Sequence, residues 1–105
     1  MTDNAARYLA IIQFKADTPI AELAKRVPGL QARISRLANG EMEQVFRSPE
    51  GLTFGVFFKS KVPSGVIWSE LDGPTANGDT FLVFEVGSFV TAKGFGRAAT
   101  WLQRH

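Results

Sequence analysis

Apolar residues along the chain follow two different periods, which predicts a mixture of strands and helices. Residues 8–15 form a short apolar run that is β-branched at its centre, so they predict a central strand covered on both faces. Residues 20–37 carry apolar side chains at steps of three and four, as one face of a helix does. Pro28 and Gly29 interrupt that stripe, because proline removes a backbone donor and crowds the preceding turn. We therefore expect two short helices with a break, the first capped by Thr18 with Pro19 as its first residue.

The rest of the chain predicts a hairpin, a second helix, a strand and a terminal helix. Residues 41–48 and 52–59 resemble two strands, and the proline and glycine between them supply turn geometry. Residues 62–71 predict a short helix that starts near Pro63 and Ser64. A turn-rich loop then leads into residues 81–86, which are apolar except for Glu85 and predict a strand buried on both faces.

This order of elements predicts an α+β fold of the ferredoxin-like βαββαβ type, with an extra short strand and a C-terminal helix. The length of 105 residues fits a single domain, residues 1–105. In this topology both helices cover one face of the sheet, so the other face needs the terminal helix or a second copy. Residues 88–92 predict a further strand that can pair with an exposed sheet edge. We therefore expect a homodimer, with a candidate dimer strand made of Ser88, Phe89, Val90 and Thr91.

Charge is unevenly distributed along the chain although the net charge is only +2. Cations gather in the first helical region and near the C-terminus, whereas carboxylates gather in the middle. Such segregation suits either solvated helix faces or a surface that attracts a polyanion. Trp68 and Trp101 are candidates for base stacking only if they are exposed, and otherwise for core or dimer packing. The candidate nucleic-acid-binding residues are Arg33, Arg36, Lys93, Arg97 and Arg104.

Several chemistries are disfavoured by the side chains that the chain carries. It has no cysteine and one histidine, the terminal His105, so thiolate nucleophiles and histidine-based triads have no candidates. Zinc, haem and copper sites are also not expected. The acidic pairs Glu41 with Glu43 and Glu70 with Asp72 stand beside turns, where solvation competes with metal binding as the explanation. No catalytic residue, metal site or cofactor is predicted.

Two features near the C-terminus have both a structural and a functional interpretation. Glu85 lies inside an apolar strand, so if buried it needs a partner such as Lys15, Lys59 or an arginine of another subunit. A catalytic role is the alternative. Gly94 to Arg97 suits the entry of the last helix, with Phe95, Ala98 and Leu102 on its packed face. Phosphate binding is the alternative, but the GxGxxG spacing and the lysine of a P-loop are missing.

Three stretches together resemble a known group of small proteins: YLAIIQF at 8–14, QVFRSPEGLTFGVF at 44–57 and GDTFLVFEVGSFVTAKGFGRAATWL at 78–102. The pattern is similar to the ferredoxin-like CRISPR-adaptation nuclease, SinR-like and VapD-like group. The resemblance implies subunits that pair through their sheets and, in some members, nucleic-acid cleavage by an aspartate just past the first strand. Here Phe14 and Lys15 occupy that place, and Asp17 follows later at the expected helix start. The resemblance therefore implies the scaffold rather than the activity.

The sequence favours a non-enzymatic dimeric scaffold that binds a protein or nucleic-acid partner. A magnesium-dependent nuclease of the CRISPR-adaptation or VapD-like type is the first alternative, and a small-ligand sensor is the second. The N-terminus lacks the order of a signal peptide, and no apolar stretch approaches the length of a membrane span. A cytoplasmic location without membrane attachment is the expectation.

Overall fold

The computed structural model describes residues 5–76, 78–87 and 96–105, which fold into a four-stranded sheet with helices on both sides. The sheet order is β2-β3-β1-β4, and all neighbouring strands are antiparallel. This is the ferredoxin-like α+β topology that the sequence predicts, with β1 and β3 at the centre. The elements are β1 (Ala6–Gln13), α1 (Ile20–Leu37), β2 (Met42–Arg47), β3 (Thr53–Ser60), α2 (Ser64–Asp72), β4 (Thr80–Glu85) and α3 (Arg97–Arg104).

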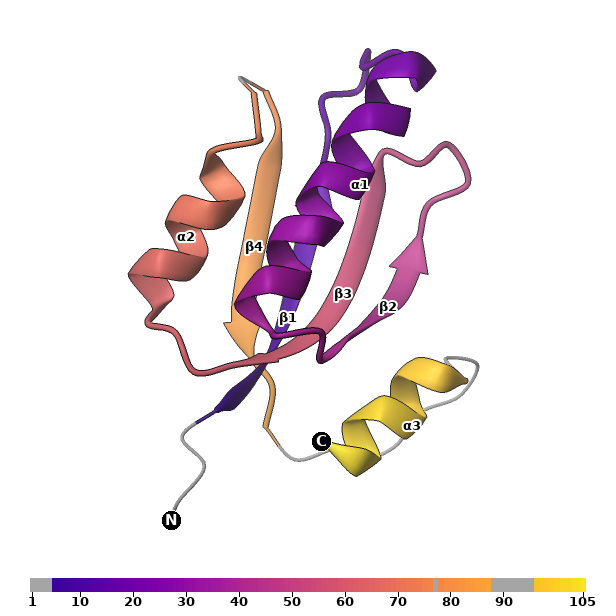
Figure 1. Ribbon diagram of the computed structural model, residues 1–105. Coiled ribbons are helices and arrows are strands. Elements are labelled where there is room, and N and C mark those ends of the chain that lie inside the picture. Colours follow the sequence, from indigo (N-terminus) through magenta and orange to yellow (C-terminus); the bar gives the residue numbers. More distant parts are fainter. Residues whose placement is uncertain (1–4, 77, 88–95) are drawn as a thin grey trace.

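The main core lies between the sheet and the two helices α1 and α2, which occupy the same face (Figure 1). Alternate residues of the central strands point into it, because successive side chains of a strand face opposite sides. The apolar stripe of α1 and two residues of α2 complete the layer. Fully or almost fully buried residues here include Ala10, Ile12, Phe54, Val56, Phe58, Leu30, Ile34, Ile67 and Leu71.

Helix α1 is continuous from Ile20 to Leu37, so the prediction of two short helices was wrong. Pro28 and Gly29 both face solvent, where the lost backbone hydrogen bond is tolerated most easily. Leu23 and Val27 before the proline and Leu30 and Ile34 after it are buried in one core. Packing of both halves against the same sheet therefore outweighs the local effect of the proline.

The two ends of α1 are formed in different ways, and the first differs from the predicted cap. Pro19, not Thr18, is the N-cap, and no side chain caps the helix. The Thr18 hydroxyl instead donates to the Lys15 carbonyl at 2.6 Å, which closes a turn ahead of the helix. Asn39 and Gly40 follow the last turn with φ values of 50° and 83°, the left-handed conformation in which helices commonly end.

The sheet face opposite α1 and α2, here called the open face, is covered only in part by α3. Trp101 of α3 stacks on Phe57 of β3 with ring centroids 6.1 Å apart. Arg7 donates from Nη1 to the Leu102 carbonyl at 2.8 Å, which ties the same helix to β1. Ala98 and Leu102 are buried, as predicted, and the helix begins after Gly96. The terminal helix thus closes the part of the open face over β2 and β3.

Candidate interaction surfaces on strand β4

Strand β4 is exposed in a way that its sequence does not predict. Leu82 is 57% exposed and Phe84 is 44% exposed, so the prediction of burial on both faces was wrong. Phe81 and Val83, which alternate with them, pack at the margin of the main core. An apolar run has the same appearance whether both faces are covered inside one subunit or one face is left for a partner. The structure leaves one face of β4 largely uncovered.

The exposed side chains of β4 join two residues of β1 into a continuous apolar surface. Leu9 lies opposite Phe84 in the β1–β4 ladder, and Ile11 lies opposite Leu82. Directly opposite residues of an antiparallel pair share one face, so all four side chains project from the open face. We call Leu9, Ile11, Leu82 and Phe84 the open-face strip. It contains no charged residue.

The outer edge of β4 is also free, because within the described ranges no strand pairs with it. Val86 donates its N–H to the Arg7 carbonyl at 2.8 Å, which identifies these two residues as a hydrogen-bonded pair. Hydrogen-bonded pairs alternate along an antiparallel ladder. The N–H and C=O groups of Phe81, Val83 and Glu85 therefore point away from β1, toward solvent.

The other edge strand, β2, is protected against pairing. Its ladder with β3 is interrupted by a bulge between Gln44 and Phe46. Glu43 and Arg47 place charges along it, and Arg97 of α3 lies 3.4 Å from Glu43. Bulges, charges and a covering helix are the usual means by which natural sheets block unwanted strand addition. Strand β4 has none of these along residues 80–84.

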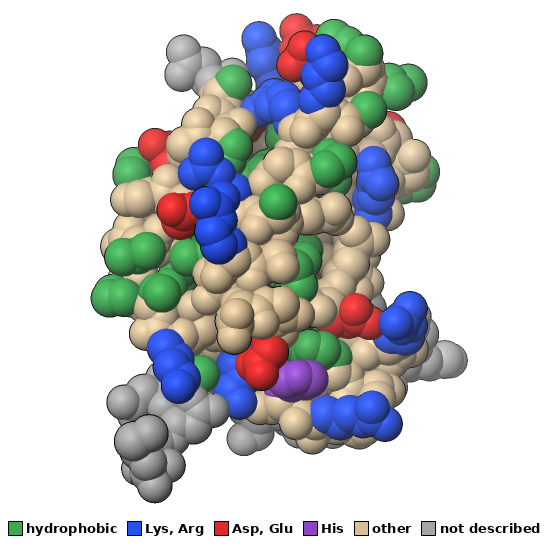
Figure 2. All heavy atoms as spheres, viewed as in Figure 1, with side chains coloured by type: hydrophobic (Ala, Val, Ile, Leu, Met, Phe, Trp, Pro, Cys, Tyr) green, Lys and Arg blue, Asp and Glu red, His purple; other side chains and the backbone are tan. Residues whose placement is uncertain are grey.

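A groove of about 1040 Å³ runs between α2 and the free edge of β4. Trp68 of α2, 57% exposed, forms one wall, and its ring lies 6.5 Å from that of Phe81 on β4. Figure 2 shows hydrophobic side chains gathered over α2, on the same side of the molecule. We call this site the edge groove, defined by Trp68, Asp72, Phe81, Val83 and Glu85.

The edge groove is acidic although the chain as a whole is net positive. Its lining includes three carboxylates, Asp72, Asp79 and Glu85, and no lysine, arginine or histidine. Asp79 is neutralised by Arg26. Within the described part of the chain the carboxylates of Asp72 and Glu85 form no ion pair. Because α2 and β4 run in opposite directions, these two acids lie toward opposite ends of the groove (Figure 1).

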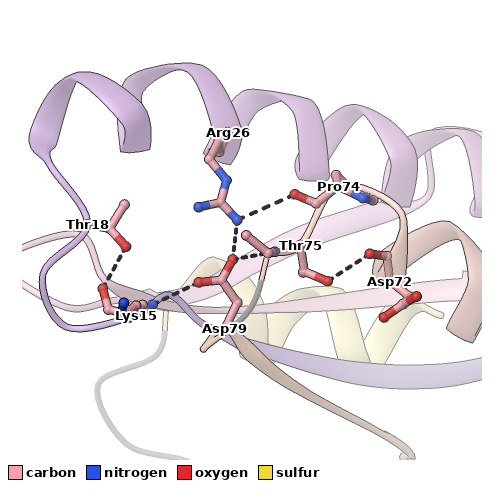
Figure 3. Close-up of polar contacts among 8 residues, drawn as sticks. Lys15, Thr18, Arg26, Asp72, Pro74, Thr75 and Asp79 are labelled. Carbon is pink, nitrogen blue, oxygen red and sulfur yellow. Dashed lines mark hydrogen bonds and ion pairs between the residues drawn. The ribbon is translucent and has the colours of Figure 1, made fainter.

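The start of β4 is fixed by Asp79, whose side chain is only 1% exposed. Its Oδ1 accepts the Lys15 N–H at 2.8 Å, and its Oδ2 accepts the Ala76 N–H at 2.8 Å and also contacts the Arg26 guanidinium. Arg26 also lies over the Phe14 ring, with its guanidinium carbon 4.9 Å from the ring centroid. Figure 3 shows Asp79 at the point where the loop before β4, the end of β1 and α1 converge. This network holds one end of the edge groove in place.

We expect these contacts to make the stability of the protein depend on pH. Burial alone would raise the pKa of Asp79, but the hydrogen bonds from Ala76 and Lys15 and the Arg26 guanidinium together lower it below 3.8. A carboxyl group with a lowered folded-state pKa contributes stability that is fully present above its unfolded-state pKa, about 3.9. We expect the free energy of unfolding to fall as the pH drops from about 4 through the folded-state pKa. Urea denaturation at a series of pH values measures this, and a pH-independent difference between the wild type and Asp79→Asn would contradict it.

The structure divides the predicted nucleic-acid-binding residues between opposite sides of the sheet. Arg33 and Arg36 lie on α1, where Arg33 is 3.5 Å from Glu70. Arg97 and Arg104 lie on α3, which packs on the open face. Lys93 lies outside the described residues. In Figure 2 the basic side chains are scattered over the visible face, with acidic side chains near several of them.

Other predicted features have varied outcomes. The candidate dimer strand Ser88–Thr91 and the residues Gly94 and Phe95 lie outside the described residues. Glu85 is exposed, so it does not need the buried partner that its sequence context suggested. Across residues 5–76, 78–87 and 96–105, no three acidic or histidine side chains are placed to hold a metal ion. Trp68 is the exposed tryptophan and Trp101 the buried one.

Comparisons with known proteins identify neither a family nor an activity for the chain. No protein-family model matches the chain, and no curated protein matches it either. The chain is similar to the crystal structure of a dimeric protein of unknown function and ferredoxin-like fold from Bacteroides fragilis, with 10% identity over 80% of this chain and 98% of that chain, at a TM-score of 0.46. It is also similar to a protein of unknown function from Nitrosomonas europaea, with 15% identity over 87% of this chain and 98% of that chain, at a TM-score of 0.41. None of the helices described is long and apolar enough to cross a membrane.

Proposed function

We propose that the protein is a non-enzymatic homodimeric interaction module whose subunits associate through the open-face strip. The observation that carries this proposal is the exposure of Leu82 and Phe84 on a folded subunit. Together with Leu9 and Ile11 they form one apolar surface beside the part of the sheet that α3 closes. Removing such side chains from water contributes about 25 cal/mol per Å² of apolar surface.

A second copy is the occupant that the strip favours. In a two-fold dimer the same patch of both subunits forms the interface, so charged side chains in the patch would face like charges of the second copy. The four side chains of the strip are neutral, so these side chains do not repel their copies when two strips meet. The division of the cations between two sides of the sheet favours a protein over a nucleic acid as any further partner.

Charge introduced into the strip tests this proposal. We expect the wild type to sediment as a dimer at tens of micromolar, and Leu82→Asp combined with Phe84→Asp to raise the dimer dissociation constant about a hundredfold. Both side chains are exposed, so the variant keeps its fold, which circular dichroism verifies. The matched control is Ile20→Asp, because Ile20 is 82% exposed on α1, away from the strip.

Two results would contradict the proposal. One is a wild type that remains monomeric at tens of micromolar in sedimentation velocity. The other is a dimer that Ile20→Asp weakens as much as the double substitution does, since this would place the interface on the helix side of the sheet.

A further inference from the structure

We propose that the edge groove binds an extended peptide segment of a partner protein, which adds to β4 as a fifth strand of the sheet. The segment has apolar side chains at alternate positions and carries lysine or arginine. This inference builds on the proposed role as an interaction module, and it concerns the outer edge and helix side of β4. The open-face strip lies on the other face of the same strand, and Leu82 and Phe84 of the strip also line the groove. Three properties of the groove lead to it: free backbone groups, an apolar wall and uncompensated negative charge.

The free backbone groups define the direction and spacing of the ligand. Phe81, Val83 and Glu85 present N–H and C=O groups outward at every second residue, as the alternation of the β1–β4 ladder requires. An added strand satisfies these groups with regular hydrogen bonds along its own backbone, which provides affinity independent of sequence. Strand β2 at the other edge is blocked by its bulge and by α3, so strand addition is directed to β4.

The apolar wall selects side chains at alternate positions of the ligand. On the helix side of the sheet, every second residue of an added strand faces Trp68, Phe81 and Val83 under α2. A large aromatic side chain that is more than half exposed on a folded domain is a typical anchor for a partner. The combination of strand edge and neighbouring helix forms a groove in which main-chain bonds give affinity and side-chain contacts give specificity.

The charge of the groove decides between a second copy and a different partner. Asp72 and Glu85 lie toward its two ends, and the lining contains no cation. Two copies joined edge to edge would bring two acidic grooves together. A ligand strand with a lysine or arginine near each end instead forms one ion pair with Asp72 and one with Glu85. Each ion pair contributes about 0.2–1 kcal/mol at an exposed site.

The test uses the full chain and a synthetic pool of peptides with a six-residue core, the length of β4. Apolar β-branched residues alternate with threonine in the core, and lysine flanks it. Matched pools carry glutamate in place of lysine, or proline at alternate core positions. Fluorescence anisotropy is expected to show saturable binding of the lysine pool, binding of the glutamate pool weaker by about fivefold or more, and no binding of the proline pool.

Protein variants locate that binding at the groove. Val83→Pro removes an outward N–H without removing a bond to β1, and proline is tolerated on edge strands in that orientation. We expect it to abolish peptide binding. Glu85→Lys should weaken binding of the lysine pool about fivefold and strengthen binding of the glutamate pool. Trp68→Ala should weaken binding of the lysine pool and of the glutamate pool about tenfold each.

Sedimentation of the same samples separates this inference from the dimer proposal. No binding of the lysine pool to a protein that is folded and dimeric overturns the groove assignment alone. If Val83→Pro converts a dimer to a folded monomer, the edge pairs with a second copy and the peptide assignment is overturned. If Leu82→Asp with Phe84→Asp gives a monomer that still binds the peptide, both proposals are supported. Equal binding of the lysine and proline pools would show contact without strand addition, which also overturns the proposal.

Discussion

Asp79→Asn is expected to lower the free energy of unfolding by about 3 kcal/mol, which corresponds to a fall in melting temperature of about 15 °C for a domain of this size. The aspartate accepts two backbone N–H groups and pairs with Arg26. An asparagine in the same orientation places its side-chain NH₂ group against the Ala76 N–H and the Arg26 guanidinium, which are themselves donors. It also leaves Arg26 without its counter-ion. Removing one partner of a largely buried ion pair costs more than the pair contributes in total, because the remaining charge stays desolvated.

Asp17→Asn is the matched control, because Asp17 also forms an ion pair, with Lys15 at 3.8 Å, but on the surface. Exposed pairs of this kind contribute at most about 1 kcal/mol. Urea denaturation of the two variants should therefore give clearly different midpoints. Similar small losses in both would show that Asp79 does not hold the start of β4. If Asp79→Asn lowers the free energy of unfolding as expected, it should also weaken peptide binding in the edge groove. The reason is that Asp79 directly precedes Thr80, the first residue of β4.

The order of elements could be predicted from the sequence because it depends on local patterns. The steps of three and four in α1, the turn before β3 and the apolar run of β4 each occur within a short stretch. The same local patterns do not show how the elements pack against one another in the folded protein. Pro28 suggested a broken helix, yet Leu23, Val27, Leu30 and Ile34 are buried in a common core, so tertiary packing preserves the helix.

The candidate surfaces were harder to predict because they depend on what remains uncovered. The run from Phe81 to Val86 correctly indicated a strand, but its exposure depends on where α3 lies. One available signal was that residues 80–84 contain no charged residue and no proline, which is unusual for an unpaired edge. The edge groove combines Trp68 with residues of β4 that are more than ten positions away in sequence, and no spacing rule connects them.

The placement of the candidate nucleic-acid-binding residues on two sides of the sheet was hard to predict for a similar reason. Arg33 and Arg97 both lie on helices with basic residues, and the sequence gives no indication that these helices occupy opposite sides of the sheet. Phe57 is the residue that decides it, since it points away from its neighbour Phe58 in the core and stacks on Trp101. A strand separates side chains onto two faces, and α3 follows the aromatic residue on the open face.

Trp101→Ala is accordingly expected to detach α3 and lower the free energy of unfolding by about 3 kcal/mol. Trp101 is the largest buried side chain of α3 and stacks on Phe57. Helix α3 has eight residues, and a helix that short is not stable in water without packing. The variant should therefore lose helical circular dichroism and bind more of an apolar dye, because Phe57 becomes accessible.

His105→Ala is the matched control for this experiment. His105 also stacks on Trp101, with ring centroids 4.3 Å apart, but it is exposed at the end of the chain. Its removal should change the free energy of unfolding by less than about 0.5 kcal/mol and leave dye binding unchanged. Full helical signal in Trp101→Ala would show that Ala98 and Leu102 hold α3 without the tryptophan. In that case the part of the open face over β2 and β3 would stay closed, and the open-face strip would keep its present boundary.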